Sequence, residues 1–515
     1  MALPVFKNEP FTDFSRSENK EQMQQALVLV KQQFGATYPL VIGGQKLMTK
    51  AVLPSYNPAN LQEVIGSVAQ ADQTLIDQAF QAASSTFETW RYTSAEQRAG
   101  YLLKAAAILR RRKFEFSAWM VYETGKNWAE ADGDTAEAID FLEFYAREMI
   151  RLAKPQDLTP LPSEQNQQIY IPLGVGIIIP PWNFPLAILA GMTTAAIIAG
   201  NTVLLKPSPN ASVVAAKFMA VMEEVGLPAG VINFVPGPPE KIGDYMTEHA
   251  TTRFVSFTGS SHVGMHIIER TAKRQKGQNW IKRVVAEMGG KDAIVVDKEA
   301  NLEEAASAIV ASAFGFQGQK CSAASRAIIH KDVYDEMVTR ILAKTKQLKL
   351  GTPAEDVAMG PLIDERAYAK VQKYIEIGKQ EATLALGGNL GSDEGYFIEP
   401  TIFVDCKSEN RIMQEEIFGP VLAIARAESF EDAVAIFNDT EYGLTGSLFT
   451  YDRSHLEYAK QRMHCGNLYF NRKCTGALVG VHPFGGFNMS GTDSKAGGYD
   501  YLLQFLQAKV VSERF

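Results

Sequence analysis

Cys321 lies among small and polar residues in the segment 315–326, directly after an apolar helical pattern. Two glycines upstream, Gly315 and Gly318, are expected to keep bulky side chains away from its sulfur. The thiolate is the reactive form of cysteine, and the pKa of a free thiol is about 8.5, so a catalytic cysteine needs access and help in losing its proton. A lone cysteine is more often a buried structural thiol. The catalytic interpretation of Cys321 therefore depends on partner residues elsewhere in the chain.

Asn183 and Glu287 are of the types that assist such a nucleophile. Asn183 lies between prolines in the segment 180–185, and its fixed amide could donate a hydrogen bond to a developing oxyanion. The alternative is a rigid turn, since proline and asparagine both favour turns. Glu287 is followed by Met288 and two glycines, which leave its carboxylate room for water or substrate. The alternative for Glu287 is a salt-bridged strand end.

Two further motifs have residues that suit a nucleotide. The segment 257–264 places small residues before a predicted helix, where free N–H groups can meet a phosphate. It is not a GxGxxG fingerprint, so alone it is a weak signal, and His262 within it is interpreted as a polar residue at the helix start. Lys206, which is followed by Pro-Ser-Pro, could reach a ribose hydroxyl. The alternative is an ordinary surface lysine.

The elements that must position these motifs are alternating strands and helices. Short β-branched runs separated by helical patterns predict βαβ units and a parallel sheet. Ligands of such sheets bind beyond the carboxyl ends of the strands, where the motifs above lie, and a second alternating block predicts a second α/β domain. The predicted strands are 175–179, 202–205, 231–235, 253–257 and 281–285, then 293–296, 327–330, 401–404, 421–424, 447–449 and 466–470. Helices are predicted to begin near Pro185, Ala211, Pro239 and Ser261, and to cover 302–316 and 333–348.

The flanking segments are predicted to cover these two blocks. Ser94 to Gln97 has the pattern of a capping box that opens a helix with a core-facing apolar stripe. The segment 133–153 is an amphipathic helix whose acids, Glu137 and Asp140 among them, are predicted to form a solvated face. Residues 1–36 are polar and expected to wrap the outside of the first domain. The extended tail, 508–513, has the polar segment 163–168 as a possible partner flap.

The composition excludes several classes of protein. The chain has 515 residues, of which 46% are hydrophobic, which suggests two or three domains with their own cores. A formal net charge of −7 gives no reason to expect a nucleic-acid partner. The 4 cysteines form no CxxC pair, so we expect neither a disulfide framework nor a zinc site, and a reducing cytoplasm is predicted. The start lacks a signal-peptide pattern, and the apolar segment 184–200 is too short and proline-bounded for a membrane span, so a buried helix is predicted there.

Taken in this order, the residues resemble the NAD(P)-dependent aldehyde dehydrogenase superfamily from about residue 37 to the end. The most specific part is Glu287 followed by Cys321, the segment 415–421 (EEIFGPV) and the segment 483–486 (PFGG). The resemblance implies an α/β fold with two Rossmann-like α/β domains and a small β oligomerisation arm. The implied boundaries are an N-terminal helical extension at 1–36, an NAD-binding domain at 37–153 and 170–287, a catalytic domain at 288–489, and the arm at 154–169 and 490–515.

The resemblance also implies a role for each motif. Cys321 would add to the aldehyde, Asn183 and the Cys321 backbone N–H would hold the oxyanion, and Glu287 would activate water to release a thioester. Lys206 would hold the adenosine ribose, Gly259 and Ser260 the pyrophosphate, and Glu416 the nicotinamide ribose, with Phe418 bracing that end. No metal ion is implied. The full implied cofactor set is Ile179, Pro180, Pro181, Trp182, Lys206, Ser208, Pro209, Gly237, Thr258, Gly259, Ser260, Met288, Glu416 and Phe418.

Two departures from the family pattern stand out. Many NAD-preferring relatives carry a glutamate three residues after the lysine, where this chain has Pro209, so NAD is implied with NADP left open. Met288 replaces the usual leucine, a volume-conserving change that should be tolerated. Lys320 could lower the pKa of its neighbour Cys321, although the side chains of adjacent residues often diverge. The other cysteines, Cys406, Cys465 and Cys474, match no nucleophile motif and are interpreted as structural.

The residues around the sulfur indicate which aldehyde is used. Ser322 offers a hydroxyl, the turn at Gly476 and Ala477 exposes N–H groups that could cradle a carboxylate, and Phe184 and Phe484 could pack on an aliphatic chain. Without the family context, a turn shaped only for chain reversal would be preferred.

These features, with the segments 471–477 and 490–498, resemble the monofunctional 1-pyrroline-5-carboxylate dehydrogenase branch. That implies oxidation of L-glutamate γ-semialdehyde to L-glutamate with NAD, the second step of proline degradation, by a homodimer or higher homo-oligomer joined through the arm.

Three alternatives remain open at this point. One is an aldehyde dehydrogenase for another substrate, such as succinate semialdehyde or betaine aldehyde, which should carry a different loop before Pro483. Another is an acylating enzyme that passes the thioester to coenzyme A, against which the retention of Glu287 argues. The last is a non-catalytic structural or binding relative, which would have no use for Cys321, Glu287 and Asn183 together.

Overall fold

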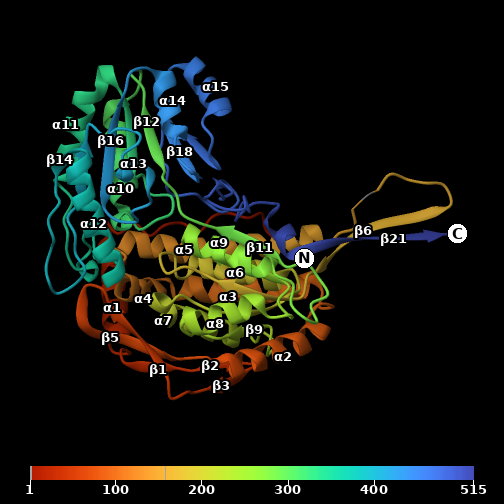
Figure 1. Cartoon of the computed structure of the whole chain (residues 1–515). Helices are drawn as coiled ribbons and strands as arrows, with labels where there is room; N and C mark the ends of the chain where they lie inside the picture. Colours follow the sequence, from red (N-terminus) through yellow and green to blue (C-terminus); the bar gives the residue numbers. More distant parts are fainter. Residues whose placement is uncertain (1–2, 157) are drawn as a thin grey trace.

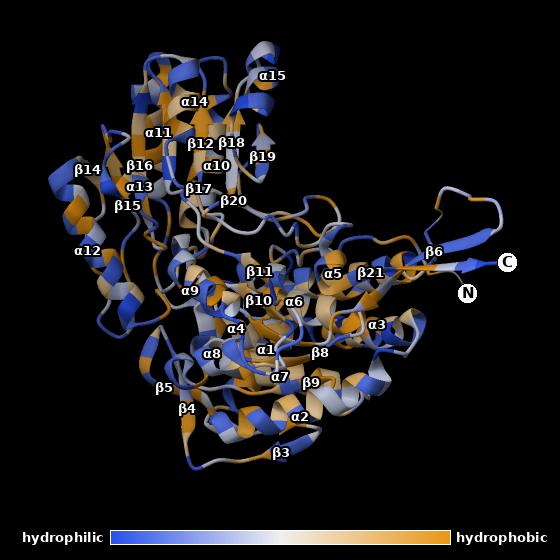
Figure 2. Ribbon diagram, turned by 45° about the vertical axis from the view of Figure 1, so that its right-hand side comes forward, coloured by the Kyte–Doolittle hydropathy of each residue, from blue (hydrophilic) through white to orange (hydrophobic). Residues whose placement is uncertain are grey.

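The computed structural model describes residues 3–156 and 158–515. Figure 1 shows two α/β bodies stacked one above the other, with a thin two-stranded arm that extends to one side. Each body contains a seven-stranded sheet. Figure 2 shows several central strands of the sheets, such as β12 and β10, in orange, inside bodies whose outer helices carry blue faces. The predicted α/β class, with two such units and an arm, is confirmed.

The first sheet has the order β11-β10-β7-β8-β9-β2-β3, and its first five strands are parallel. Successive residues of these strands enter different cores: Ile177 packs in one cluster and Ile178 in another. Both faces are therefore covered, which explains the continuous apolar runs in the sequence. The five predicted parallel strands are confirmed to within two residues. The bounds are β2 Leu40–Ile42, β3 Gln45–Leu47, β7 Val175–Ile179, β8 Thr202–Leu205, β9 Ile232–Phe234, β10 Phe254–Thr258 and β11 Arg283–Glu287.

Helices cover both faces of this sheet. One face packs on α2, α8 and α9, and the other on α6 and α7, with α3, α4 and α5 outside them. The apolar segment predicted as a buried helix is α6, whose residues are almost all buried. Ser94 caps α3 with the predicted reciprocal capping box to Gln97. The bounds are α1 Ser17–Lys31, α2 Gln73–Trp90, α3 Ala95–Arg111, α4 Lys113–Thr124, α5 Trp128–Leu152, α6 Ala187–Ile198, α7 Ser212–Glu224, α8 Pro239–Glu248 and α9 Ser261–Ala272.

The predicted solvated face of α5 is wrong. Asp132, Asp134 and Asp140 are all buried, and Glu137 is only partly exposed. The helix begins earlier than expected, at an Asn127 cap, and packs against α3, α4 and α6. Helix periodicity separates polar from apolar faces but does not tell which polar face another segment covers.

The second sheet has the order β14-β15-β16-β13-β12-β18-β19, parallel except for the edge strand β14. All six predicted strands are present. The helix predicted at 302–316 is α10, which ends two residues earlier, and the helix predicted at 333–348 is α11. The strands are β12 Ala293–Val296, β13 Arg326–His330, β14 Thr383–Leu386, β15 Thr401–Val404, β16 Val421–Ala427, β18 Thr445–Phe449 and β19 Asn467–Phe470. The helices are α10 Leu302–Phe314, α11 Tyr334–Thr345, α12 Glu365–Glu381, α13 Arg411–Gln414, α14 Phe430–Asn438 and α15 Arg453–Arg462.

The arm consists of β6 Glu164–Pro172 and β21 Leu506–Arg514, which pair antiparallel along their whole length. This confirms the predicted pairing of the tail with the flap. In Figure 1 the pair projects beyond both bodies, and most of β21 is exposed. Two small sheets complete the described chain: β1 Ala36–Tyr38 with β5 Asn60–Ala69 and β4 Val52–Asn57, and β17 Tyr442–Gly443 with β20 Phe487–Asn488.

The domain boundaries given above stay a prediction, because the structure describes elements and sheets rather than limits of domains. Residues 1–2 of the predicted extension and residue 157 of the predicted arm lie outside the described residues. Within the described ranges, no helix is long and apolar enough to cross a membrane.

Candidate active site

Cys321 and Glu287 line one cavity of about 380 Å³. Its walls come from α5 and α6, from the loop that carries Cys321, and from the segments 473–484 and 496–501. The cavity therefore brings together residues that are more than 180 positions apart in the sequence. All five predicted substrate-binding residues line it: Phe184, Ser322, Gly476, Ala477 and Phe484.

The loop that carries Cys321 has an unusual backbone. Phe316, Gln317 and Gly318 have φ angles of 49°, 56° and 69°. For the two non-glycine residues this left-handed conformation costs on the order of 1–3 kcal/mol each and needs support from the surroundings. The Gln317 amide supplies part of it by donating to the Gly125 carbonyl at 3.2 Å and the Pro361 carbonyl at 2.9 Å. The nucleophile loop is thereby fixed to the first body and to the segment before α12.

The reason predicted for the upstream glycines needs correction. A Cβ on Gly318 would lie 2.3 Å from the Gly419 carbonyl oxygen, and one on Gly315 would lie 3.1 Å from a Glu130 carboxylate oxygen. Neither nearest contact is the Cys321 sulfur. These glycines let neighbouring segments approach the loop rather than clear space around the thiol.

The thiol of Cys321 is in its less reactive form in this state. Burial raises its pKa well above the ordinary value, and the carboxylates of Asp292, Glu287 and Glu416 raise it further. Lys320 does not offset them, since its ammonium forms a 2.6 Å ion pair with Glu130 of α5. The minor role considered for Lys320 in lowering the pKa of Cys321 is thus not supported. Formation of the thiolate requires a neighbouring base or a change in the local charge.

Asn183 is fixed directly beside the nucleophile loop. It is buried, and its amide nitrogen donates to the Gln319 carbonyl oxygen at 3.0 Å, two residues before Cys321. An amide nitrogen carries two hydrogens, so one remains for a further acceptor. The position therefore fits an oxyanion donor, and the rigid-turn alternative does not account for this contact across the two bodies.

Glu287 ends β11, and the C-terminal segment holds its carboxylate. The carboxylate accepts hydrogen bonds from the Ser494 hydroxyl at 2.5 Å, the Gly486 N–H at 3.3 Å and the Ser494 N–H at 3.4 Å. Burial raises the pKa of Glu287 to about 7, although these hydrogen bonds act in the opposite direction. A carboxylate that titrates near neutral pH suits a general base. Among the described residues Glu287 forms no ion pair, so the alternative of a salt-bridged strand end is not supported, and hydrogen-bond donors hold the carboxylate instead.

The carboxyl ends of β7 to β11 meet at one edge of the first sheet, as expected for parallel strands. Ser260 caps α9 by accepting from the Val263 N–H at 3.4 Å. The predicted cofactor residues from the first body all lie at or just after these strand ends. They are Ile179, the last residue of β7, with Pro180 to Trp182 after it, Lys206, Ser208 and Pro209 after β8, Gly237 after β9, Thr258, the last residue of β10, with Gly259 and Ser260 after it, and Met288 after β11.

Lys206 is not a surface lysine. It is only 3% exposed, and burial lowers its pKa to about 8. Its ammonium has one hydrogen bond among the described residues, a long one of 3.5 Å to the Pro207 carbonyl. A buried ammonium with so weak a partner fits a ligand rich in hydroxyls, such as the ribose of a dinucleotide.

The second body reaches the same edge through Glu416 and Phe418. The Gly290 N–H donates to the Glu416 carboxylate at 3.1 Å, and the Phe418 ring meets the Trp182 ring edge-on at 5.6 Å. Both predicted cofactor residues of this segment thus face loops that follow β7 and β11. A dinucleotide along this edge would lie between the two bodies.

Two buried charges near the cavity were missed in the sequence. The Lys126 ammonium lies 3.3 Å from the Asp134 carboxylate, and both side chains are 0% exposed. The same ammonium lies 4.0 Å from the centre of the Phe184 ring and 4.3 Å from that of Phe316. It therefore joins a ring of the cavity wall to a ring of the nucleophile loop. A lysine just after a helix-ending glycine gives no signal of burial, so only the tertiary structure reveals it.

Glu137 also lines the cavity, where burial and the Asp134 carboxylate raise its pKa to about 8. Lys320 and Lys473 line the same cavity and bring positive charge to it. Besides Cys321 and Glu287, the cavity is thus lined by these two lysines and by five acidic residues, Glu130, Asp132, Asp134, Glu137 and Asp140. Within the described ranges, no group of three or more His, Cys, Asp or Glu side chains is arranged to hold a metal ion.

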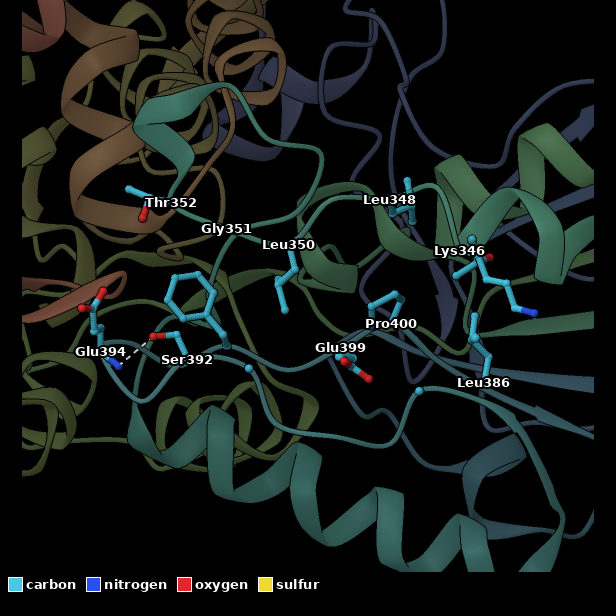
Figure 3. Close-up of a pocket in the computed structure, with 14 residues that line it drawn as sticks. Lys346, Leu348, Leu350, Gly351, Thr352, Leu386, Ser392, Glu394, Glu399 and Pro400 are labelled. Atoms are coloured by element: carbon cyan, nitrogen blue, oxygen red, sulfur yellow. Dashed lines mark hydrogen bonds between the residues drawn. The ribbon is translucent and has the colours of Figure 1, made fainter.

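A larger cavity of about 510 Å³ lies elsewhere in the second body, between the end of α11 and the loop before β15 (Figure 3). It contains Lys346, Glu394 and Glu399 as its charged residues, and the Glu394 N–H donates to the Ser392 hydroxyl at 3.3 Å. None of the predicted site residues lines it. The cavity at Cys321 is identified as the candidate active site by the reactive side chains that line it, although it is the smaller of the two cavities.

Comparison with known proteins agrees with this geometry. Residues 46–511 match the aldehyde dehydrogenase family. The chain is 58% identical over 511 residues to 1-pyrroline-5-carboxylate dehydrogenase of Geobacillus thermodenitrificans, covering 99% of both chains. It superposes with a TM-score of 0.99, at 48% identity and 100% coverage of both chains, on the crystal structure of 1-pyrroline-5-carboxylate dehydrogenase from Thermus with bound NAD. Betaine aldehyde dehydrogenase of Staphylococcus aureus, in complex with NAD+, is similar at a TM-score of 0.89 and 27% identity, covering 96% of this chain and 97% of that one.

Proposed function

Because the chain belongs to the aldehyde dehydrogenase family, we propose that it oxidises L-glutamate γ-semialdehyde, the open form of 1-pyrroline-5-carboxylate, to L-glutamate with NAD. The family that the sequence resembled is confirmed. The substrate is proposed from the relatives that share more than half of its residues and from the charges of the cavity. In this role the protein would carry out the second step of proline degradation.

Three side chains would perform the chemistry on the acyl group. The Cys321 sulfur adds to the aldehyde carbon, and the negative charge on the former carbonyl oxygen is held by the Asn183 amide and the Cys321 backbone N–H. NAD, when bound, supplies a hydride acceptor. The acyl group then remains on Cys321 as a thioester, and Glu287 takes a proton from the water that attacks it. Lys206, Glu416, Phe418 and the N-terminus of α9 would hold the dinucleotide at the sheet edge.

The distribution of charge in the cavity carries the substrate assignment. Glutamate γ-semialdehyde bears a carboxylate and an ammonium at the end opposite the aldehyde. Gly476 has a φ of 75° in the turn proposed to cradle the carboxylate, and Lys473 lies beside it. Glu137 would receive the ammonium, since an approaching cation favours the ionised form of a carboxyl group. Succinate semialdehyde, the second candidate, has no ammonium and would leave Glu137 without a partner.

Steady-state kinetics with a panel of aldehydes tests this proposal. The panel contains glutamate γ-semialdehyde, succinate semialdehyde, betaine aldehyde and propionaldehyde, each with NAD and with NADP. We expect the highest kcat/KM for glutamate γ-semialdehyde with NAD. A higher kcat/KM for propionaldehyde, which has no charge, would refute the substrate assignment while leaving the family intact.

The loop after β8 carries no carboxylate that would select NAD over NADP. Pro209 opens a short 3-10 turn at the site where a carboxylate would exclude a 2′-phosphate. The NAD-bound relative with the same fold supports NAD as the physiological cofactor. The proposal therefore predicts turnover with both dinucleotides and a preference for NAD.

We further propose that the arm joins two copies of the chain. Val510 and Val511 on β21 are 60% and 43% exposed, and an exposed two-stranded edge is suited to pair with another chain. Light scattering of the protein and of a Val510→Glu/Val511→Glu variant tests this: a dimer or higher oligomer is expected for the former and a smaller species for the latter.

A cytoplasmic location is also proposed, and the four free cysteines support it.

A further inference from the structure

The residues before α1 form an extended segment, 3–16, which we call the N-terminal strap. In Figure 1 the chain starts beside the arm and crosses the lower body before it reaches α1. The strap contains no strand and runs along α5, the helix whose acids line the cavity. Its contacts explain why this face of α5 is not solvated.

Two buried aspartates of α5 bind the strap. The Asp140 carboxylate accepts from the Asn8 amide at 2.8 Å and from the Glu9 N–H at 2.6 Å. The Asp132 carboxylate accepts from the N–H and the hydroxyl of Thr12, at 2.8 and 2.5 Å. Charge-assisted hydrogen bonds of this kind are roughly twice as strong as neutral ones. The strap is thereby held at two points on either side of Phe11.

Aromatic contacts hold the strap at both ends. The Phe6 ring meets the Phe144 ring edge-on at 5.3 Å, and the Phe14 ring meets Trp128 edge-on at 5.5 Å. Both partners belong to α5: Trp128 is its first residue, and Phe144 lies in its second half. The strap therefore packs along much of the helix, and its middle is positioned by contacts on both sides.

The middle of the strap is part of the active-site cavity. Phe11 and Thr12 line it together with Cys321. The Phe11 side chain is 63% exposed, although hydrogen bonds to α5 hold the strap on both sides of it. A Cβ on Gly133 would lie 3.9 Å from this ring, so the ring lies over the one residue of that helical turn that has no side chain. These facts place Phe11 at the edge of the cavity that solvent reaches.

The strap also touches the opposite wall of the cavity. The Asn8 amide that donates to Asp140 donates as well to the Val479 carbonyl, at 2.9 Å. Val479 follows Gly476 and Ala477 by two or three residues, in the loop proposed to cradle the substrate carboxylate. Asn8 therefore links α5 to that loop across the cavity.

We propose that the N-terminal strap determines which aldehydes the enzyme accepts. Phe11 forms the outer wall of the substrate cavity and excludes aldehydes longer than the glutamate skeleton. Asn8 is a positioning residue that fixes the turn at Gly476 and Ala477 against α5. The identity of the preferred substrate rests on the proposed function, whereas the position of Phe11 at the cavity comes from the structure alone.

Kinetics of a Phe11→Ala variant test the role of the wall. With NAD, we expect kcat/KM for octanal, relative to that for glutamate γ-semialdehyde, to rise about tenfold, the effect of removing an apolar contact that discriminates by size. Tyr92→Ala, which removes a ring that is 77% exposed between α2 and α3, is the matched control and should leave the ratio unchanged. A Phe11→Ala ratio within twofold of the original would overturn the proposal.

A thiol probe tests the wall without any aldehyde. Cys321 is the one partly exposed cysteine, and the other three are buried. In the presence of NAD, pyrenyl maleimide and iodoacetamide would be reacted with the protein and the modified Cys321 peptide followed by mass spectrometry. Phe11→Ala should accelerate the bulky reagent about fivefold or more while leaving the small one within twofold. Equal acceleration of both reagents would indicate loosening rather than loss of a wall and would refute the proposal. If the aldehyde panel fails, this result still decides the role of the strap.

Asn8→Ala tests the positioning role. Because the Asn8 amide touches neither the sulfur nor the Glu287 carboxylate in the described contacts, we expect KM for glutamate γ-semialdehyde to rise about fivefold with kcat within twofold. A merely structural role would lower kcat and thermal stability without raising KM selectively. That outcome, with an unchanged KM, would remove Asn8 from the proposal.

Discussion

The cavity at Cys321 has two walls of different origin. One wall consists of loops, namely the nucleophile loop with Ser322, the segment after β7 with Phe184, and the loops with Gly476, Ala477 and Phe484. The other is α5, with Glu137 and the buried aspartates, covered by the N-terminal strap. The reactive residues of the loop wall lie in short segments that can be found in the sequence. The helix wall has its chemistry in acids that become functional only because another segment buries them.

The sequence predicts the loop wall but not the helix wall. Loops that follow strands of a parallel sheet meet at one edge whatever else the fold contains, so their side chains can be placed from the strand pattern alone. An acid on an amphipathic helix is solvated or buried according to what covers it, and that is a tertiary property. Substitutions in the two walls should therefore differ in kind: variants of the loop wall that carries the nucleophile change turnover, whereas variants of the helix wall change stability and recognition of the substrate ammonium.

The largest effect is expected at Cys321. Cys321→Ala removes the atom that forms the acyl intermediate and should lower kcat/KM by at least about a thousandfold. Cys406→Ala is the control, since Cys406 is buried in the core of the second body, and its activity should stay within threefold of the original. If Cys321→Ala still oxidised the aldehyde at more than about a tenth of the original rate, Cys321 would not be the nucleophile.

Glu287→Gln should have the next largest effect. The amide cannot take a proton from water, so hydrolysis of the thioester should slow by about 10²–10⁴-fold while formation of the acyl-enzyme persists. Intact-protein mass spectrometry after mixing with aldehyde and NAD should show a stable adduct on Cys321. If no adduct accumulates although the aldehyde is bound, Glu287 acts before the acyl-enzyme rather than after it.

The buried pair behind the cavity should affect stability more than chemistry. Lys126→Met leaves the Asp134 carboxylate buried without its cation, and Asp134→Leu leaves the ammonium, each at a cost of about 3–5 kcal/mol. The double variant removes both charges and should lose less, so its thermal midpoint should exceed that of either single variant. A double variant less stable than both single variants would show that the pair does not act as a unit.

Much of this molecule follows from the sequence, and the exceptions share a cause. The strand at 175–179, the capping box at Ser94 and the helix inside 184–200 were predicted because local propensity and tertiary packing agree there. The position of the cofactor residues at one edge of the first sheet follows from the same strand pattern. Lys126 and the acids of α5 were missed because burial by a distant segment leaves no local pattern. The strained turn at Phe316 and Gln317 was also beyond reach, because side-chain bonds to residues 125 and 361 hold it.

Glu137→Gln should change the preference between two aldehydes by about one order of magnitude. Loss of the carboxylate removes the proposed partner of the substrate ammonium, so kcat/KM for glutamate γ-semialdehyde should fall about tenfold, typical of a charged hydrogen bond. The value for succinate semialdehyde, which has no ammonium, should not change. Glu143→Gln, on the same helix but paired with Arg110 and Arg147, is the matched control. An equal fall for both aldehydes would assign Glu137 to the fold rather than to the substrate.

The smallest effect concerns the acidity of Glu287. Its pKa of about 7 means that the carboxylate form, which is the base, becomes populated as the pH rises through that value, so deacylation should accelerate between about pH 6 and 8. The Ser494 hydroxyl donates to the carboxylate and therefore favours the ionised form. Ser494→Ala should raise the pKa of Glu287 and shift the rising limb of the rate of thioester hydrolysis to higher pH, with a loss of only a few-fold at neutral pH and near-complete recovery at pH 9. Ser494→Thr keeps the hydroxyl and should keep the original profile. A shift toward lower pH would mean that the hydroxyl favours the protonated form of Glu287, and the C-terminal segment would then hold back the base instead of supporting it.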